Sequence, residues 1–378
     1  MEYHPEQLAA KCLQEINQKI RNLKKLNIVI LGKSGVGKST LINSVFRENL
    51  AKTGIGRPVT QEIRSYTKPD FPLTIYDTPG FELGKEQQDK TKKEVLELIR
   101  NGASSDDVNK AIHCIWYCIN VGSNRTFDSF EEAWLREFTE ENKITKVPIF
   151  IILTQACPKK KALEMQKLVE AENFHISKVV PVLAQDMELD EDYTVKAYGL
   201  NTLIDLMTQV LPDDLQDTLQ NVQKASLDAK KKRAQAIVAG AVATAFGEGF
   251  VPVPFADAAM LVPTQVTMLA SITAVFGMNI SKSLLTCFVS STIGAGGATI
   301  LGRTIVSNLL KLTGVGAVLG GTISGTTAGL LTTALGEAYI KILEMIFKGE
   351  MRQEELDTPE GKKKIKDLFL EFLKKNKN

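Results

Sequence analysis

Residues 32–39 read GKSGVGKS, which matches the phosphate-loop pattern G-x-x-x-x-G-K-[ST]. The apolar run IVIL at 28–31 precedes this stretch directly, and the stretch TLINSVF at 40–46 is typical of a helix. A strand, a glycine-rich turn and a helix N-terminus in this order turn backbone N–H groups toward phosphate oxygens. Lys38 would reach the β- and γ-phosphates, and the Ser39 hydroxyl would bind Mg²⁺. The sequence therefore predicts a nucleoside-triphosphate site.

Two further motifs follow the loop in the order that this chemistry requires. The stretch DTPG at 77–80 comes directly after the strand-like run 73–76. The Asp77 carboxylate would hold Mg²⁺ through water, and the N–H of Gly80 would meet the γ-phosphate. Thr60, in the intervening loop, is either the threonine that binds Mg²⁺ only beside a triphosphate or an ordinary loop residue. The expected metal ligands are Ser39, Thr60 and Asp77, and the expected catalytic residues are Lys38, Thr60 and Gly80.

These three motifs resemble the translation-factor-related GTPases, especially the branch with Era-like, septin-like and chloroplast-import-receptor-like proteins. The resemblance covers residues 26–212, and the string GKSGVGKSTLINS at 32–44 carries most of it. It implies a chain that binds GTP and GDP, hydrolyses GTP and uses Mg²⁺ as cofactor. The residues of the loop and first helical turn that would contact the nucleotide are Lys33, Ser34, Gly35, Val36, Gly37, Lys38, Ser39 and Thr40.

The motif that reads the guanine base departs from the family pattern. Family members usually carry N/T-K-x-D after the fifth strand, whereas residues 154–157 read TQAC. Thr154 fits the first position and the stem of Gln155 would cover the base, but the aspartate that pairs with guanine is missing. Leu183 and Ala184 fall at the family's final base-edge motif. We expect GTP as the ligand, with ATP or weak base selectivity as the alternative.

The residue after DTPG also departs from the family. It is Phe81, where many members have a glutamine that orients the attacking water. A phenylalanine cannot orient water, so we expect slow intrinsic hydrolysis, with an activating residue from a partner, a second copy or another loop. Within the chain, the candidates are Lys33 in the phosphate loop and Arg57, Gln61 and Arg125 in neighbouring loops, and each of these is more often simply solvated.

The predicted fold class is α/β, a P-loop GTPase domain with a mainly parallel sheet, followed by an all-α domain. Strand-like runs alternate with helical stretches between residues 26 and 212, which is typical of a parallel sheet covered by helices. The predicted strands are 28–31, 73–76, 112–121, 147–153 and 179–183, and the helical stretches are 87–100, 129–140 and 161–172. The expected domains are an amphipathic helix at 1–25, the GTPase domain at 26–212 and a helical domain at 213–378.

The helical domain is rich in Gly, Ala, Thr and Leu. Its uncharged runs 258–281, 284–302 and 312–336 are long enough to span a bilayer, but charged residues separate them and Ser and Thr dilute them. A membrane-associated domain and a soluble helical bundle are therefore both open. The Pro-bounded turn at 249–258 and the helices after it resemble the C-terminal domain of unknown function that is fused to GTPase domains in many bacterial proteins.

Both ends of the chain predict helices. Apolar residues recur at helical spacing over residues 8–23, and a role in core packing is favoured there over a membrane role. Thr358 is a predicted N-cap, followed by Pro359 at the first helical position. The first six residues have no apolar signal-peptide core, so the expected location is the cytoplasm, free or at the inner face of a membrane.

The composition of the 378-residue chain excludes little by itself. The net charge of +2 gives no reason to expect a nucleic-acid partner. The five cysteines are odd in number and scattered, which favours free thiols over a metal site.

Together the patterns favour a GTP-binding and GTP-hydrolysing switch whose nucleotide state controls a helical effector domain. One alternative is a nucleotide-gated binding module with negligible hydrolysis. A second is a self-assembling membrane-remodelling GTPase that pairs as a homodimer through its nucleotide face. The expected partners are GTP, a second copy of the chain, and either membrane lipid or an unknown protein.

Overall fold

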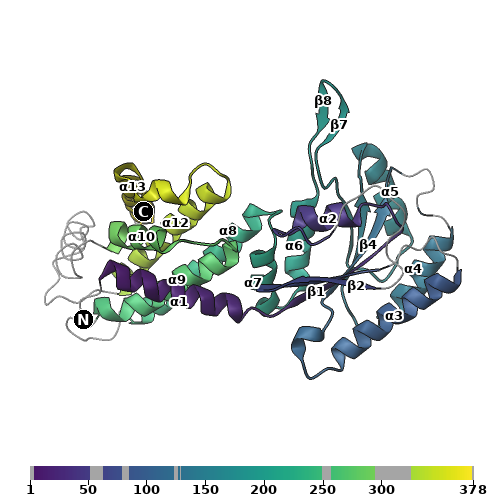
Figure 1. Ribbon diagram of the computed structural model, residues 1–378, viewed down its shortest axis with the longest axis horizontal. Helices are drawn as coiled ribbons and strands as arrows, with labels where there is room; N and C mark the ends of the chain where they lie inside the picture. The colour runs from purple at the N-terminus through teal and green to yellow at the C-terminus, as the bar shows by residue number, and fades with distance from the viewer. Residues whose placement is uncertain are drawn as a thin grey trace. The chain divides into compact units, whose positions relative to one another are not determined.

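The computed structural model describes residues 4–51, 63–78, 85–122, 127, 129–248, 257–293 and 325–376. Contacts between residues divide the chain into two compact units. One unit is Leu23–Ala229, and the other combines Met1–Asn22 with Lys230–Asn378. Figure 1 shows the helices and strands of both units.

The first unit contains a six-stranded sheet with the strand order β2-β3-β1-β4-β5-β6. Its strands are β1 (Leu26–Leu31), β2 (Arg64–Lys68), β3 (Phe71–Asp77), β4 (Cys114–Asn120), β5 (Ile149–Thr154) and β6 (Lys178–Pro181). All neighbouring strands are parallel except β2 and β3, which pair antiparallel. Every residue of β1 and β5 is buried, because helices cover both faces of a parallel sheet. The predicted mainly parallel sheet is confirmed.

Helices pack on both faces of this sheet (Figure 1). They are α2 (Lys38–Val45), α3 (Lys85–Ala103), α4 (Ser129–Asn142), α5 (Lys159–Ala171), α6 (Leu200–Val210) and α7 (Asp213–Val222), with the short helix η1 (Val108–Lys110). Helices α2, α6 and α7 share one buried cluster with Ile28 and Ile30, whereas α3, α4 and α5 share the other with Val29 and Leu31. Successive side chains of a strand point to opposite faces, so β1 contributes to both clusters.

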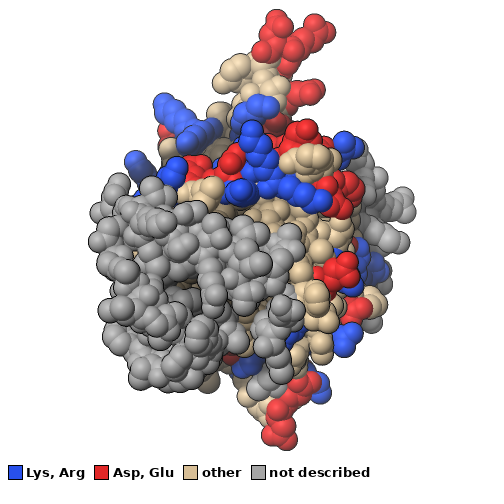
Figure 2. Space-filling view, turned by 90° about the vertical axis from the view of Figure 1, so that its left-hand side faces the viewer, with Lys and Arg blue, Asp and Glu red and all other residues tan. Residues whose placement is uncertain are grey.

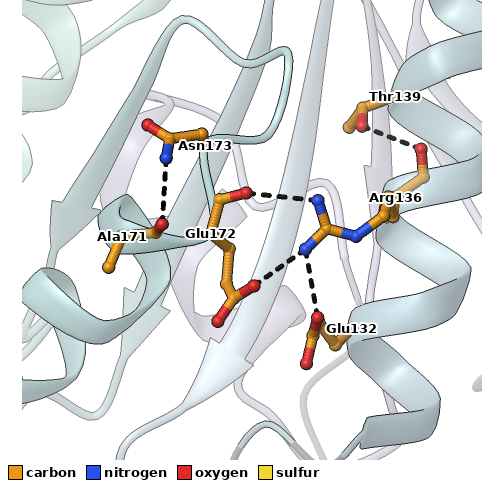
Figure 3. Close-up of polar contacts among 6 residues, drawn as sticks. All are labelled: Glu132, Arg136, Thr139, Ala171, Glu172 and Asn173. Carbon is orange, nitrogen blue, oxygen red and sulfur yellow. Dashed lines mark hydrogen bonds and ion pairs between the residues drawn. The ribbon is translucent and has the colours of Figure 1, made fainter.

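Arg136 braces α4 against the end of α5 (Figure 3). Its guanidinium donates to the Glu172 carboxylate at 2.8 Å and to the Glu172 backbone carbonyl at 3.3 Å. The same group pairs with Glu132 one turn earlier at 3.0 Å, and it lies 5.1 Å from the centre of the Phe174 ring. These contacts fix the C-terminal end of α5 on α4.

A separate two-stranded sheet lies between β6 and α6. Strands β7 (Met187–Asp190) and β8 (Tyr193–Val195) pair antiparallel and project as a hairpin (Figure 1). The sequence patterns predict neither this hairpin nor β2, since both consist mainly of exposed and polar residues.

The second unit consists of helices joined by short turns in its described residues. Its elements are α1 (Pro5–Arg21), α8 (Leu227–Glu248), which begins in the first unit, α9 (Asp257–Phe276), α10 (Lys282–Ile293), α12 (Gly325–Phe347), η2 (Gln353–Asp357) and α13 (Pro359–Lys375). Helix α1 packs on α9 and α10, and α12 packs on α9 and α13. The Thr358 hydroxyl accepts from the Gly361 N–H at 3.1 Å, which confirms the predicted cap of α13. Within the described ranges, no helix has both the length and the apolar character to cross a membrane.

The compact units have different limits from the expected domains. Residues 213–229 lie with the sheet, because Leu215, Leu219 and Val222 of α7 join its core. Helix α1 lies with the C-terminal helices instead, because its apolar side chains pack on α9 and α10. The domain boundaries at residues 25 and 212 stay a prediction.

The second unit buries a lysine at the end of α9. Lys230 is fully buried, and its Nζ donates to the carbonyl oxygens of Val275 at 3.1 Å and Phe276 at 3.0 Å. These are the last two carbonyls of α9, where the helix dipole favours a positive charge.

A second buried charge joins α8 to α12. The Glu344 carboxylate is 7% exposed and lies within 3.5 Å of the ammonium groups of Lys231, Lys341 and Lys348. Burial by itself raises the pKa of Glu344, but the hydrogen bonds from Lys348 and Lys341 and the charge of Lys231 outweigh it and lower the pKa to about 2. The carboxylate therefore stays charged among its three lysines.

Candidate nucleotide site

The phosphate loop connects β1 to α2 in the geometry that its sequence predicts. Gly32 and Gly37 have φ angles of 139° and 94°, a region that residues with side chains rarely adopt. A Cβ at Gly32 would also collide with the backbone oxygen of Cys118 on β4. Gly37 is the N-cap of α2, so the helix begins directly at Lys38 with its first N–H groups facing the loop.

Lys38 lies inside the curve of the loop. Its Nζ donates to the carbonyl oxygens of Gly32 at 2.8 Å and Lys33 at 3.1 Å. An ammonium group has three N–H donors, so this position leaves a donor for a phosphate oxygen. Ser39 and Thr40 are half-buried in the first turn of α2, beside Lys38.

Asp77 is the last residue of β3 and pairs in register with Ile30 of β1. The side chain is buried, and its Oδ2 lies 3.5 Å from the hydroxyl of Tyr66. Among the described residues, Oδ1 has no hydrogen-bond partner. Burial raises the pKa of Asp77, and the positive charge of Lys38 opposes that rise.

The Asp77 carboxylate and the Ser39 hydroxyl fit a magnesium ion as ligands. Hard divalent cations take oxygen ligands, and an unsatisfied buried carboxylate oxygen gains a partner when such a cation binds. Asp77 supplies that oxygen, and Ser39 supplies a hydroxyl at the end of the adjacent phosphate loop. Thr60, the third expected ligand, lies outside the described residues, as do Gly80 and Phe81.

Thr154 fastens β5 to the phosphate loop. Its hydroxyl lies 2.5 Å from the carbonyl oxygen of Val36 and 3.1 Å from that of Ile119. The sequence places this threonine in a base-reading motif, whereas its buried hydroxyl here contacts the loop backbone. Gln155 is exposed with φ of 48°, and its Nε2 lies 3.4 Å from the Gly35 carbonyl, so its stem lies over the loop.

The expected base-edge residues lie close to the segment that follows Gln155. Leu183 is buried and exchanges two backbone hydrogen bonds with Tyr198, at 3.0 and 2.9 Å. Ala184 follows it and is half-buried. The hydroxyl of Tyr198 donates to the Ala156 carbonyl at 2.6 Å, which ties this segment to the loop after Gln155.

Lys33 has a partner that sequence reasoning does not identify. Its Nζ lies 2.8 Å from one carboxylate oxygen of Glu131, and the Tyr117 hydroxyl lies 2.9 Å from the other. Glu131 is buried in the first turn of α4 and is separated from Lys33 by 98 positions, so no local pattern links the two. The pair holds the phosphate loop against α4. The other activating candidates, Arg57, Gln61 and Arg125, lie outside the described residues.

Comparison with protein families matches both parts of the chain. Residues 27–155 match the family described as "50S ribosome-binding GTPase", and residues 208–378 match "Domain of unknown function (DUF697)". The chain combines a P-loop GTPase domain with a domain of unknown function. The expected resemblance to Era-like GTPases with an added helical domain is confirmed.

Two curated relatives each match half of this chain or less. GTPase Era of Clostridium kluyveri is 26% identical over 190 residues, which cover 49% of this chain and 56% of that protein. GTP-binding protein A of Dictyostelium discoideum is 30% identical over 138 residues, 34% of this chain and 28% of that protein. The chain thus spans only about half the length of the Era proteins that it matches.

Solved structures that are similar to part of the chain include those of Era and Toc33. Era of Aquifex aeolicus bound to GDP.AlF4− is 19% identical, with a TM-score of 0.35, over 50% of this chain and 58% of that one. Toc33 from Arabidopsis thaliana in complex with Mg²⁺ and GMPPNP is 22% identical, with a TM-score of 0.31, over 54% of this chain and 92% of that one.

Proposed function

We propose that this chain is a GTP-binding and GTP-hydrolysing switch whose nucleotide state controls its helical unit. One observation carries the proposal: Lys38 is held inside the phosphate loop, and at the end of the adjacent strand β3 the Asp77 Oδ1 has no hydrogen-bond partner among the described residues. A loop that only made a turn would need neither an inward ammonium nor a buried carboxylate.

The residues divide the work as follows. The N–H groups of the loop and of the first turn of α2 would bind the β- and γ-phosphates, and Lys38 would add its remaining donor. Ser39, Asp77 and Thr60 would hold Mg²⁺, and Gly80 would contact the γ-phosphate. Bound Mg²⁺ would neutralise charge on the transferred phosphoryl group. The Lys33–Glu131 pair keeps the loop in place against α4.

Guanine recognition in this proposal does not use the usual aspartate. Gln155 would cover the base over the loop, and Leu183 and Ala184 would line its edge. Without the bidentate acceptor, the preference for GTP over ATP is expected to be weaker than in the family pattern.

Hydrolysis by a single copy would be slow, because Phe81 cannot orient water. The missing group would come from a second copy that pairs through the nucleotide face, or from another partner. The helical unit would carry the output, either at the cytoplasmic face of a membrane or on a protein partner.

The test is phosphate release from GTP and from ATP over a series of protein concentrations, with Mg²⁺ present. GTP turnover per molecule should rise with concentration, and ATP turnover should stay lower. Lys38→Ala should reduce turnover about 100-fold. Lys363→Ala removes an exposed lysine from α13 and should leave turnover unchanged. Flat, near-zero GTP turnover with intact binding would instead favour a nucleotide-gated binding module, and equal use of ATP would contradict the guanine preference.

A further inference from the structure

The β7–β8 hairpin is anchored in the GTPase domain at the segment that holds the expected base-edge residues. The paired backbones of Leu183 and Tyr198 close its base, and the Tyr198 hydroxyl holds the Ala156 carbonyl. Just above them Asp186 accepts from Lys196 at 2.8 Å and from the N–H of Ala197 at 2.8 Å. The arm therefore projects from a fixed base.

The arm exposes apolar side chains. Leu189 and Tyr193 near its tip are 56% and 62% exposed. Met187 and Val195 are half-buried register partners, so these two share one face. A two-stranded hairpin on its own is marginally stable in water, because it has no sheet or helix to bury an apolar face. A partner that covers this face would stabilise the arm.

The arm is also strongly acidic. Residues 186–192 hold five carboxylates, those of Asp186, Glu188, Asp190, Glu191 and Asp192. Figure 2 shows acidic side chains gathered on the projecting tip at the top of the view, where the hairpin lies in Figure 1. Any surface that covers the arm should be basic.

A basic surface of the right kind lies on the same edge of the same unit. Lys159, Lys160 and Lys161 form the first turn of α5, which has no acidic residue. The helix dipole is positive at this end, so the three lysine charges add to it, and the end of the helix favours an anionic partner. Leu163, one turn on, is 45% exposed and would meet the apolar side chains of the arm.

Geometry keeps the lysines near the root of the arm. The Nζ of Lys159 lies 5.2 Å from the centre of the Tyr198 ring. In the described part of the chain, no salt bridge joins Lys160 or Lys161 to the acidic tip. An arm that projects away from its own α5 leaves both charged surfaces available to another molecule.

We propose that the β7–β8 hairpin of one copy docks on the first turns of α5 in a second copy, and that the hairpin of the second copy docks on α5 of the first in the same way. A two-fold axis satisfies both arms and both lysine clusters at once, since the surface of each copy is complementary to itself. The proposal rests on the proposed function, because both elements flank the loop at Thr154 and Gln155 and would pair the copies along their nucleotide edges.

A charge exchange tests this pairing with the full chain. The arm variant carries Asp190→Lys, Glu191→Lys and Asp192→Lys, and the helix variant carries Lys160→Glu and Lys161→Glu. All five residues are exposed, so both variants should fold. Each variant alone places like charges opposite each other, and its dimer dissociation constant, measured by sedimentation with a non-hydrolysable GTP analogue, should rise about tenfold or more. An equimolar mixture restores both attractive contacts and should dimerise again as a heterodimer.

Two controls show whether dimerisation depends on the arm and on α5 in particular. Glu360→Lys, Asp367→Lys and Glu371→Lys on α13 change the same charge at exposed sites and should leave dimerisation unchanged. Binding of a fluorescent GTP analogue is measured in parallel for every variant. Loss of binding in the native chain would contradict the proposed function. With binding intact, a monomeric native chain, an arm variant that dimerises normally, or a mixture that stays monomeric would each overturn the docking proposal.

Discussion

Two side chains of opposite charge define the candidate site at the scale of single residues. The Lys38 ammonium is fixed by two loop carbonyls, and Asp77 is buried with one oxygen unsatisfied among the described residues. Leaving a buried carboxylate oxygen without a partner costs stability in the ligand-free protein. A bound cation would return that stability, so the site favours the loaded state.

Replacing Asp77 by asparagine tests this cost. Because burial raises the pKa of Asp77, its charged form destabilises the fold at neutral pH. We expect Asp77→Asn to be more stable than the native chain by about 1 kcal/mol at pH 7 without ligand. The difference in stability should shrink as the pH falls toward 3.8, the ordinary pKa of an aspartate. Asp77 is then protonated in the folded chain and no longer carries a buried charge. Urea unfolding at several pH values measures it.

The same variant should respond less to ligand. The stabilisation of the native chain by GTP should depend on Mg²⁺, and that dependence should be lost in Asp77→Asn. A variant that keeps the full Mg²⁺ dependence would show that Asp77 does not hold the cation.

Thr154 offers a second residue-scale test, because its sequence role and its contacts differ. Thr154→Val keeps the shape and removes the hydroxyl that meets the Val36 carbonyl. We expect a loss of about 1 kcal/mol in stability and weaker binding of GTP and ATP by the same factor. Titrations of both nucleotides measure this. A change in the ratio of the GTP and ATP affinities would instead show that Thr154 takes part in recognition of the base.

At the scale of elements, the strands that the sequence predicts are those with buried, apolar residues. β1, β3, β4, β5 and β6 follow from their apolar runs and from the order of motifs. β2 and the β7–β8 hairpin do not, since an exposed edge strand or hairpin carries no such pattern. In the site, the loop follows from its glycines and lysine. The Lys33–Glu131 contact does not, because the tertiary fold alone brings those residues together.

The ion pairs of Glu344 with Lys231, Lys341 and Lys348, which brace α8 against α12, give an element-scale prediction. The lysines hold the pKa of Glu344 at about 2 against an ordinary 4.5, so the carboxylate stabilises the fold above pH 4.5. That stability should be lost as the pH falls from 4.5 toward 2. At pH 7, Glu344→Gln should cost about 2 kcal/mol, because the lysines lose their buried partner. Urea unfolding measures this, with Glu337→Gln on the same helix as the matched control. Equal effects of the two substitutions would contradict the brace.

At the scale of the whole molecule, the chain passes between its two units twice, after Asn22 and after Ala229. Residues at the two ends of the sequence thus share one helical unit. The periodicity of residues 8–23 predicts a helix that packs in a core, but it does not identify the helices on which it packs. A nucleotide signal from the sheet would reach the helical unit through these connections. β1 begins a few residues after α1 and leads directly into the phosphate loop.

The proposed function depends on binding of Mg²⁺·GTP by the loop at Lys38. A calorimetric titration of GTP into the native chain and into Lys38→Ala, with Mg²⁺ and with a chelator, measures this binding. We expect one GTP per chain, weaker binding without Mg²⁺, weaker binding of ATP, and a loss of affinity of about 100-fold in Lys38→Ala. Equal affinity of the native chain and Lys38→Ala for GTP would contradict this role of the loop.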